Sequence, residues 1–335
     1  MPKISVIIPV YKVGEYIENS MKSVIAQTFT DFEVVLVDNN TPDDSIEIAK
    51  SILIGSGIQY TVVRQTKQGL PAARNMGIAV SKGEWLISID PDDTISSHFL
   101  SELYNCATQN GLDIVFSKYD EVGPKELFCF PEEAYSDVIE FYSKKDILYK
   151  LLVRKMPLMV SNMFFRKEYF EETHLSFDED VILGADLILL WELLARTERI
   201  AFINKCLYNH FDRPDSLMTA PSDAKIQSNI QGYYRLRDRV SQYLGSQFAD
   251  WIVAREAYAL ISTIIRYGSK GMYQKYTDIL YTSREIGCLR TFPDSKIRIL
   301  NGIYGFSKGL FYTINRVLRR PQSKMWLFLS KRLHD

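Results

Sequence analysis

The chain has 335 residues, long enough for two domains, and its 46% hydrophobic and 24% charged residues are typical of a globular protein. A formal net charge of −1 gives no overall electrostatic case for nucleic acid, so we expect no nucleic-acid partner. The four cysteines are far apart with no C-x-x-C pair, which argues against a zinc knuckle or disulfide scaffold and favours a reducing cytoplasm.

Strands and helices are predicted to alternate over the first 90 residues. The apolar stretch at 4–9 is a buried strand, too short for a signal peptide because Lys12 follows at once. The spacing of apolar residues in 14–28 predicts a helix. Further strands are predicted at 32–37, 60–63 and 84–89, and further helices from 41 and through 72–76. This alternation predicts a parallel sheet wound by right-handed crossovers, with ligands at the carboxyl ends of the strands.

The helix after the second strand carries signals for its first turn. Thr41 suits the N-cap, Pro42 the first turn and Asp44 the reciprocal capping position. We therefore expect that helix to begin at Thr41.

Polar residues follow three of these strands: 9–11, 38–40 and 90–93. Three carboxylates in four positions, Asp90, Asp92 and Asp93, repel one another unless a cation sits among them. A divalent metal bound to phosphates would supply that cation, whereas an Asp-rich solvated turn is the simpler alternative. Because neither G-x-G-x-x-G nor G-x-x-x-x-G-K-[ST] is present, the usual dinucleotide and P-loop folds are disfavoured.

Mixed elements are predicted next and helices alone thereafter. The predicted helices are 97–110, 143–154, 167–172 and 187–195, and the predicted strands are 113–118, 159–165, 201–203 and 206–211, with a hairpin at 125–131. From about 222 the pattern is helical, with breaks at Gly245, 268–271 and Pro293. We place a catalytic domain at 1–220 and a helical region at 221–335.

Several spaced motifs resemble the family 2 glycosyltransferases, inverting enzymes with the A-type nucleotide-sugar fold. They are SVIIPVY at 5–11, EYI at 15–17, SVIAQTF at 23–29, EVVLVD at 33–38, GLPAARNMG at 69–77 and IDPDD at 89–93. The match is dense over 3–120, continues in pieces to about 220 and does not reach the helical end. The chain looks most like bacterial enzymes that build capsular or other surface polysaccharides.

The resemblance implies a nucleotide-sugar donor, with UDP as the expected nucleotide. Asp38 would accept the uracil ring N–H, with a helix-entry turn as its structural alternative. Asp90 would meet the ribose or brace its loop, and Arg74 would face the diphosphate or pair with the acidic loop. The other residues implied in donor binding are Pro9, Val10 and Tyr11 around the base, Glu15, Arg64 and His210.

The resemblance also implies a metal, Mn²⁺ or Mg²⁺. Asp92 would be its main ligand, and Asp93 a weaker second ligand or a brace. The metal would neutralise charge on the departing nucleoside diphosphate. His210 could also touch the metal or diphosphate, although a lone histidine is more often structural. Arg213 and Ser216 could reach phosphate from the next loop.

An inverting transfer needs a general base, which in the family lies in a Glu-Asp pair at a helix start. Here Gly184 is followed by Ala185 and Asp186, so the Glu is missing and Asp186 is the candidate. An acid at a helix N-terminus is also a common capping device. Residues 178–180 are acidic alternatives that more simply form a solvated loop.

The C-terminal end is basic and aromatic. Residues 296–334 contain nine Lys and Arg and no acid. Such helices suit an anionic membrane surface, although they could instead pack on the catalytic domain or form a homodimer. A polyprenyl-diphosphate-linked glycan in that membrane would be the acceptor, and we expect a cytoplasmic protein peripheral on the inner face of the cell membrane.

The sequence therefore predicts a metal-dependent inverting glycosyltransferase. A nucleotidyltransferase is the first alternative, although residues 11–14 lack the Gly-, Arg- and Lys-rich stretch that such enzymes carry after the first strand. A non-catalytic nucleotide-sugar-binding scaffold is the second, and Ala185 keeps it open.

Overall fold

The computed structural model describes residues 1–123, 128, 130, 138–156, 158–182, 184–211, 221–280 and 283–318. The chain divides into two compact units, Met1–Pro214 and Asp215–Asp335, and each is described by itself. Most of the predicted hairpin at 125–131, Arg213, Ser216 and the chain beyond 318 lie outside the described residues.

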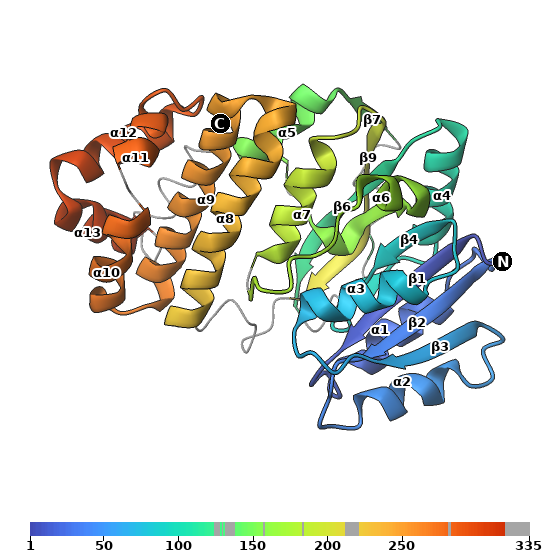
Figure 1. The fold of residues 1–335 in the computed structure, drawn as a ribbon. Helices are drawn as coiled ribbons and strands as arrows, with labels where there is room; N and C mark the ends of the chain where they lie inside the picture. The colour runs from blue at the N-terminus through green and yellow to red at the C-terminus, as the bar shows by residue number, and fades with distance from the viewer. Residues whose placement is uncertain are drawn as a thin grey trace. The chain divides into compact units, whose positions relative to one another are not determined.

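The first unit is built on a nine-stranded sheet of mostly parallel strands (Figure 1). Its order is β3-β2-β1-β4-β8-β6-β9-β5, and β7 pairs with β9. The strands are β1 (Ile4–Val10), β2 (Phe32–Asp38), β3 (Gln59–Arg64), β4 (Trp85–Ser88), β5 (Thr94–Ile95), β6 (Ile114–Val122), β7 (Ile139–Tyr142), β8 (Met163–Arg166) and β9 (Ile200–Phe211). The predicted architecture, a mostly parallel α/β sheet followed by a helical region, is confirmed.

Most strands of this sheet point the same way. β1 is parallel to β2 and β4, and β2 is parallel to β3. β8 is antiparallel to both β4 and β6, and β9 is parallel to β6, so β4, β6 and β9 also share one direction. We call the edge where these strands end the carboxyl edge, and the opposite one the amino edge. Every residue of β1 is buried, as expected of a parallel strand covered on both faces.

The strand register aligns polar residues at the carboxyl edge. Val10 lies beside Asp38, and Asp38 lies beside Arg64. On the other side of β1, the Ile89 N–H donates to the Ile7 carbonyl at 2.9 Å, which extends the pairing to the residue before Asp90. The residues that follow the four neighbouring strands β3, β2, β1 and β4 therefore lie close together at the carboxyl edge.

The helices of the first unit are α1 (Ile17–Ile25), α2 (Ser45–Leu53), α3 (Leu70–Val80), α4 (Phe99–Gln109), α5 (Lys144–Leu152), α6 (Lys167–Thr173) and α7 (Ala185–Leu194). A 3₁₀ turn, Val160–Asn162, precedes β8. α3 packs directly on β1 at Gly77, where a Cβ atom would lie 2.3 Å from Ile7 Cγ2. This close approach is possible only with glycine, and it brings the first turns of α3 near the ends of β1 and β4.

Several predicted boundaries were wrong. The strand predicted at 159–165 begins only at Met163, because a 3₁₀ turn precedes it. α2 begins at Ser45 rather than Thr41, because the Thr41 hydroxyl donates to Asp43 and its N–H donates to Asp38 in a turn before the helix. The two strands predicted at 201–211 form one strand, β9, whose pairing with β6 shifts register near Lys118. α7 begins at Ala185 instead of 187, which places Asp186 within its first turn.

The second unit consists of helices among its described residues. They are α8 (Asp223–Leu244), α9 (Ser246–Tyr267), α10 (Lys270–Leu280), α11 (Ser283–Arg290), α12 (Ser295–Phe306) and α13 (Lys308–Leu318). α8 ends and α9 begins at Gly245, which has a φ of +79°. No described helix combines the length and the hydropathy needed to cross a membrane.

Candidate functional site

The ends of β1, β2 and β3 form the first part of the candidate site. Tyr11, directly after β1, is 40% exposed, so its ring is available to a flat ligand. Asp38 at the end of β2 accepts from the Thr41 N–H with one carboxylate oxygen, and the other lies 4.0 Å from Arg64 Nε. The turn role and a ligand role for Asp38 are thus compatible. Pro9 and Val10 are buried beneath this edge, and Glu15 is exposed in the turn before α1.

Two asparagines after β2 hold the loop between β3 and α3. The Asn39 side chain is buried, donates to the carbonyls of Gln65 and Lys67, and accepts from the Gly69 N–H at 2.8 Å. Asn40 has a φ of +58° and donates to the carbonyls of Gln65 and Thr66. Asn39 therefore fixes the 65–69 loop beside Asp38.

A buried arginine links two predicted site carboxylates. Arg74 on α3 is 1% exposed, and its Nη2 lies 2.7 Å from Asp90 while its Nη1 lies 2.5 Å from Asp186. Its Nε donates to the Ser88 hydroxyl at the end of β4. Of the two alternatives for Arg74, these contacts favour the ion pair with the acidic loop. They extend it to Asp186, 96 residues beyond Asp90.

The charge balance around Arg74 keeps it protonated. Burial alone would lower the pKa of its guanidinium, but the carboxylates of Asp186 and Asp90 raise it above its usual value. The Asp186 side chain remains 38% exposed, so it can meet an incoming group while Arg74 fixes one of its oxygens. A titratable group oriented by a partner and open to solvent has the arrangement required of a general base.

Asp93 is turned into the protein. Its side chain is fully buried, and its oxygens accept from the Tyr208 hydroxyl at 2.5 Å and the Phe211 N–H at 2.8 Å. His210 Nδ1 lies 3.1 Å from the same carboxylate. These contacts fit the bracing role of Asp93 better than a place as second metal ligand, and they tie the acidic loop to the end of β9.

Asp93 raises the pKa values of both of its side-chain partners, His210 and Tyr208. The hydrogen bond to Asp93 raises the pKa of His210 to about 9, with further contributions from Asp90 and Asp92. Burial, and then Asp93, raise the pKa of Tyr208 well above its usual value, so its hydroxyl remains a donor. At neutral pH His210 is therefore a cation at the carboxyl edge, beside the place predicted for a diphosphate.

Asp92 is the residue of the acidic loop for which the sequence predicts the main metal contact. It is half-buried between the buried residues Pro91 and Asp93, and its charge reaches His210. The described residues contain no group of three or more His, Cys, Asp or Glu side chains able to hold a metal. Mg²⁺ and similar ions commonly use one or two carboxylates and complete their shell with water and substrate phosphates. The donor set fits a metal that binds together with a diphosphate.

Several residues around this site were not predicted from the sequence. Asn75 and Phe177, which join α3 to the segment before α7, gave no signal because they are about 100 residues apart. Tyr208 lies two residues before His210 on β9, so both side chains project from the same face of that strand. The two-residue spacing along a strand could have grouped Tyr208 with His210, but nothing local in the sequence identifies Asp93 as their partner.

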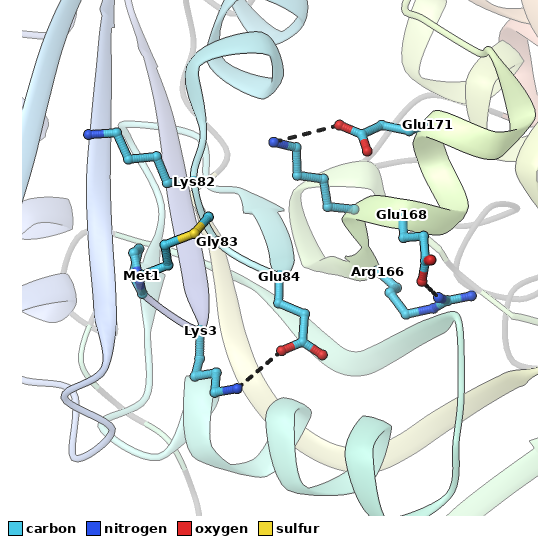
Figure 2. Close-up of a pocket in the computed structure, with 10 residues that line it drawn as sticks. Met1, Lys3, Lys82, Gly83, Glu84, Arg166, Glu168 and Glu171 are labelled. Carbon is cyan, nitrogen blue, oxygen red and sulfur yellow. Dashed lines mark hydrogen bonds and ion pairs between the residues drawn. The ribbon is translucent and has the colours of Figure 1, made fainter.

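A separate cavity of about 450 Å³ lies at the amino edge (Figure 2). Its lining includes residues that precede β1 and β4 and residues at the junction of β8 with α6. Its acids are paired with cations, as Lys3 with Glu84, Arg166 with Glu168 and Lys167 with Glu171. Because it opens at the opposite end of the strands and none of the predicted site residues lines it, we do not connect it with the candidate site.

Comparison with known proteins gives consistent matches. Residues 5–173 match the family model described as Glycosyl transferase family 2. The chain is 29% identical over 238 residues to the uncharacterized glycosyltransferase EpsJ of Bacillus subtilis (strain 168), which covers 71% of this chain and 69% of that protein. It is 27% identical over 205 residues to the poly(ribitol-phosphate) beta-N-acetylglucosaminyltransferase TarP of Staphylococcus aureus (strain N315), 59% of each chain.

The fold also matches a solved structure. TarS 1–349 of S. aureus in complex with UDP superposes with a TM-score of 0.70 at 18% sequence identity, over 96% of this chain and 92% of that one. At this level of identity the match shows the fold alone, and it confirms the predicted glycosyltransferase A type.

Proposed function

The chain belongs to glycosyl transferase family 2, and from that premise we propose that it is an inverting transferase that moves a sugar from a UDP-linked donor to a glycan hydroxyl. The glycosyltransferase assignment follows from the family. The donor nucleotide, metal, base and acceptor are our proposals.

The observation that carries the proposal is the position of Arg74. Its buried guanidinium contacts both Asp90 in the acidic loop and Asp186 on α7. This supports a transfer site in which the proposed donor-binding loop and the proposed base lie within reach of one side chain. Asp38 and Tyr11 stand two strands and one strand away from β4 on the same edge. That spacing supports a nucleotide base over β1 and β2 with its diphosphate reaching the acidic loop.

The residues then divide the chemistry. Asp38 accepts the uracil N–H, and the exposed ring of Tyr11 lies against the base. Asp186 accepts the proton of the acceptor hydroxyl as that oxygen forms its bond to the anomeric carbon. The bond from that carbon to the phosphate oxygen breaks, and UDP leaves with the electron pair from the opposite face, which inverts the configuration. The His210 cation and Arg64 would attract the diphosphate.

Asp92 is the proposed protein ligand of Mn²⁺ or Mg²⁺. When bound, the metal supplies charge neutralisation on the departing diphosphate. Asp93 serves the same loop from below, since its contacts with Tyr208 and Phe211 hold the Asp90–Asp93 turn against β9.

We further propose that the acceptor belongs to a cell-surface polymer and is carried on a polyprenyl-diphosphate lipid. The named activity of TarP on poly(ribitol-phosphate) supports the surface-polymer part. Nine Lys and Arg without an acid over 296–334 support contact with an anionic membrane, on whose inner face such a lipid is presented. A catalytic domain at 1–220, a C-terminal region at 221–335 and a homodimer built on the latter stay part of this proposal.

The test is a panel of nucleotide sugars, each with and without Mn²⁺, scored by thermal shift and by release of UDP. A bound donor stabilises the fold by mass action, and slow hydrolysis of one UDP-sugar with Mn²⁺ would argue against a scaffold. A sugar 1-phosphate with UTP should give no pyrophosphate, and its release would favour the nucleotidyltransferase instead.

A further inference from the structure

The geometry points to Asn75 as a positioning residue for Asp186, acting through the backbone of Phe177. This inference rests on the proposed role of Asp186 as base. It concerns how the segment between α6 and α7 is held, which can be measured without any sugar transfer.

The Asn75 carboxamide binds both backbone groups of one residue. Its Nδ2 donates to the Phe177 carbonyl at 2.9 Å, and its Oδ1 accepts from the Phe177 N–H at 2.9 Å. Such a pair fixes both the position and the direction of the chain at Phe177, since either bond alone would allow rotation. The other N–H of Asn75 donates to Glu179 at 2.9 Å, so three hydrogen bonds of this carboxamide go to the 177–179 segment.

The Phe177 side chain acts on the same arginine that holds Asp186. Phe177 is 2% exposed, and its ring centroid lies 5.5 Å from Arg74 Cζ. The ring therefore covers one face of the guanidinium and contributes a cation–π contact. Because Asn75 fixes the position of Phe177, it also fixes this cover over the Arg74 guanidinium.

A second tether joins the segment to the nucleotide end of the site. Glu179 lies 3.0 Å from Lys67 Nζ, and Asn75 and Lys67 hold the pKa of Glu179 below its usual value, so it stays ionised. Lys67 belongs to the 65–69 loop that Asn39 fixes beside Asp38. The segment is thus held at Phe177 and Glu179 by α3 and this loop, and at Asp186 by Arg74.

These contacts give two neighbouring residues of α3, Arg74 and Asn75, different positioning roles. Arg74 holds Asp186 itself, and Asn75 holds the chain nine residues before it. Without Asn75, Arg74 would still contact Asp186, but the segment that leads into α7 would no longer be fixed at Phe177. A displacement of about 1 Å at a reacting group can cost about 100-fold in rate. UDP binding should be spared, because the hydrogen bonds of Asn75 go to Phe177 and Glu179 and not to Asp38 or Asp90.

The experiment compares Asn75→Ala with Asn110→Ala as a matched control. Asn110 also donates one side-chain N–H to a backbone carbonyl, that of Cys106, but it follows α4 and leads to the start of β6 at the amino edge. For each full-length variant we would measure hydrogen exchange of 177–186, the affinity for UDP by calorimetry, and kcat and KM with the UDP-sugar found active in the panel.

For Asn75→Ala we expect about tenfold faster exchange of the 177–186 amides, a UDP affinity within about threefold of the native protein and a kcat about 100-fold lower with KM nearly unchanged. Asn110→Ala should change none of these. Phe177→Leu keeps the backbone bonds to Asn75 and removes the ring, so it should lower kcat without faster exchange.

Unchanged exchange of 177–186 in Asn75→Ala would overturn the inference, whatever its activity. Faster exchange with an unchanged kcat would show that the segment is held but does not position Asp186, which also overturns it. If the native protein transfers no sugar at all, the proposed function fails, whereas the exchange result still decides whether Asn75 holds the segment.

Discussion

Replacement of Arg74 by Met should destabilise the first unit more than the loss of any exposed ion pair would. The guanidinium is 1% exposed, while the carboxylates of Asp90 and Asp186 are 23% and 38% exposed. Removal of one partner from a buried ion pair costs about 3–5 kcal/mol. Because both carboxylates keep some water, we expect the lower end, about 3 kcal/mol.

Hydrogen exchange of the β1 and β4 amides under increasing urea reports unfolding of this unit by itself. Lys22→Met is the control, since it breaks an exposed pair with Glu18 on α1 and such pairs contribute little. Arg74→Met together with Asp90→Asn should recover part of the loss, because one of the two unpaired charges is gone. A loss for Arg74→Met no larger than that for Lys22→Met would refute the reasoning.

Three further predictions test other parts of the structure. Gly77→Ala should cost about 1–3 kcal/mol of stability by overpacking against Ile7. Gly302 is a helical glycine with open space around it, so Gly302→Ala should gain about 0.5–1 kcal/mol. Equal shifts in melting temperature for the two variants would contradict this. In metal-free buffer, the raised pKa of His210 means that its pair with Asp93 stabilises the fold fully below pH ~6.5 and loses this contribution as pH rises to about 9. His210→Gln should therefore flatten the dependence of stability on pH between these values. Asp92→Asn should keep the melting temperature of the metal-free protein but lose the stimulation of turnover by Mn²⁺; stimulation that persists would remove Asp92 as the ligand.

The sheet and its polar edge could be predicted because their signals are local. An apolar run such as Leu86–Ile87 that stops at Asp90 identifies both a buried strand and its end. The start of α2 could not be predicted this way. Thr41 has the right residue type for an N-cap, but its hydroxyl also accepts from the Lys12 N–H, in a loop 29 residues earlier. That contact and the one to Asp43 delay the helix to Ser45.

The roles of the site residues depended on partners that the sequence does not reveal. Two alternatives remained for Arg74 until the structure gave its burial beneath Phe177 and its contact with Asp186. Asp92 and Asp93 are identical neighbours, yet Asp93 is buried against β9 and Asp92 is half-buried. Only the contact of Asp93 with Tyr208 on β9, 115 residues away in the sequence, distinguishes Asp93 from Asp92.

The central claim is that Asp186 takes the acceptor proton while other residues bind the donor. The most direct measurement is the transfer rate of Asp186→Asn together with its affinity for UDP. Asp180→Asn is the control, an 80% exposed carboxylate six residues earlier. For Asp186→Asn we expect a transfer rate about 100- to 10,000-fold lower and a UDP affinity within about threefold of the native value, whereas Asp180→Asn should change neither. Loss of UDP binding in Asp186→Asn would instead assign Asp186 to the nucleotide site, and an unchanged transfer rate would contradict its role as base.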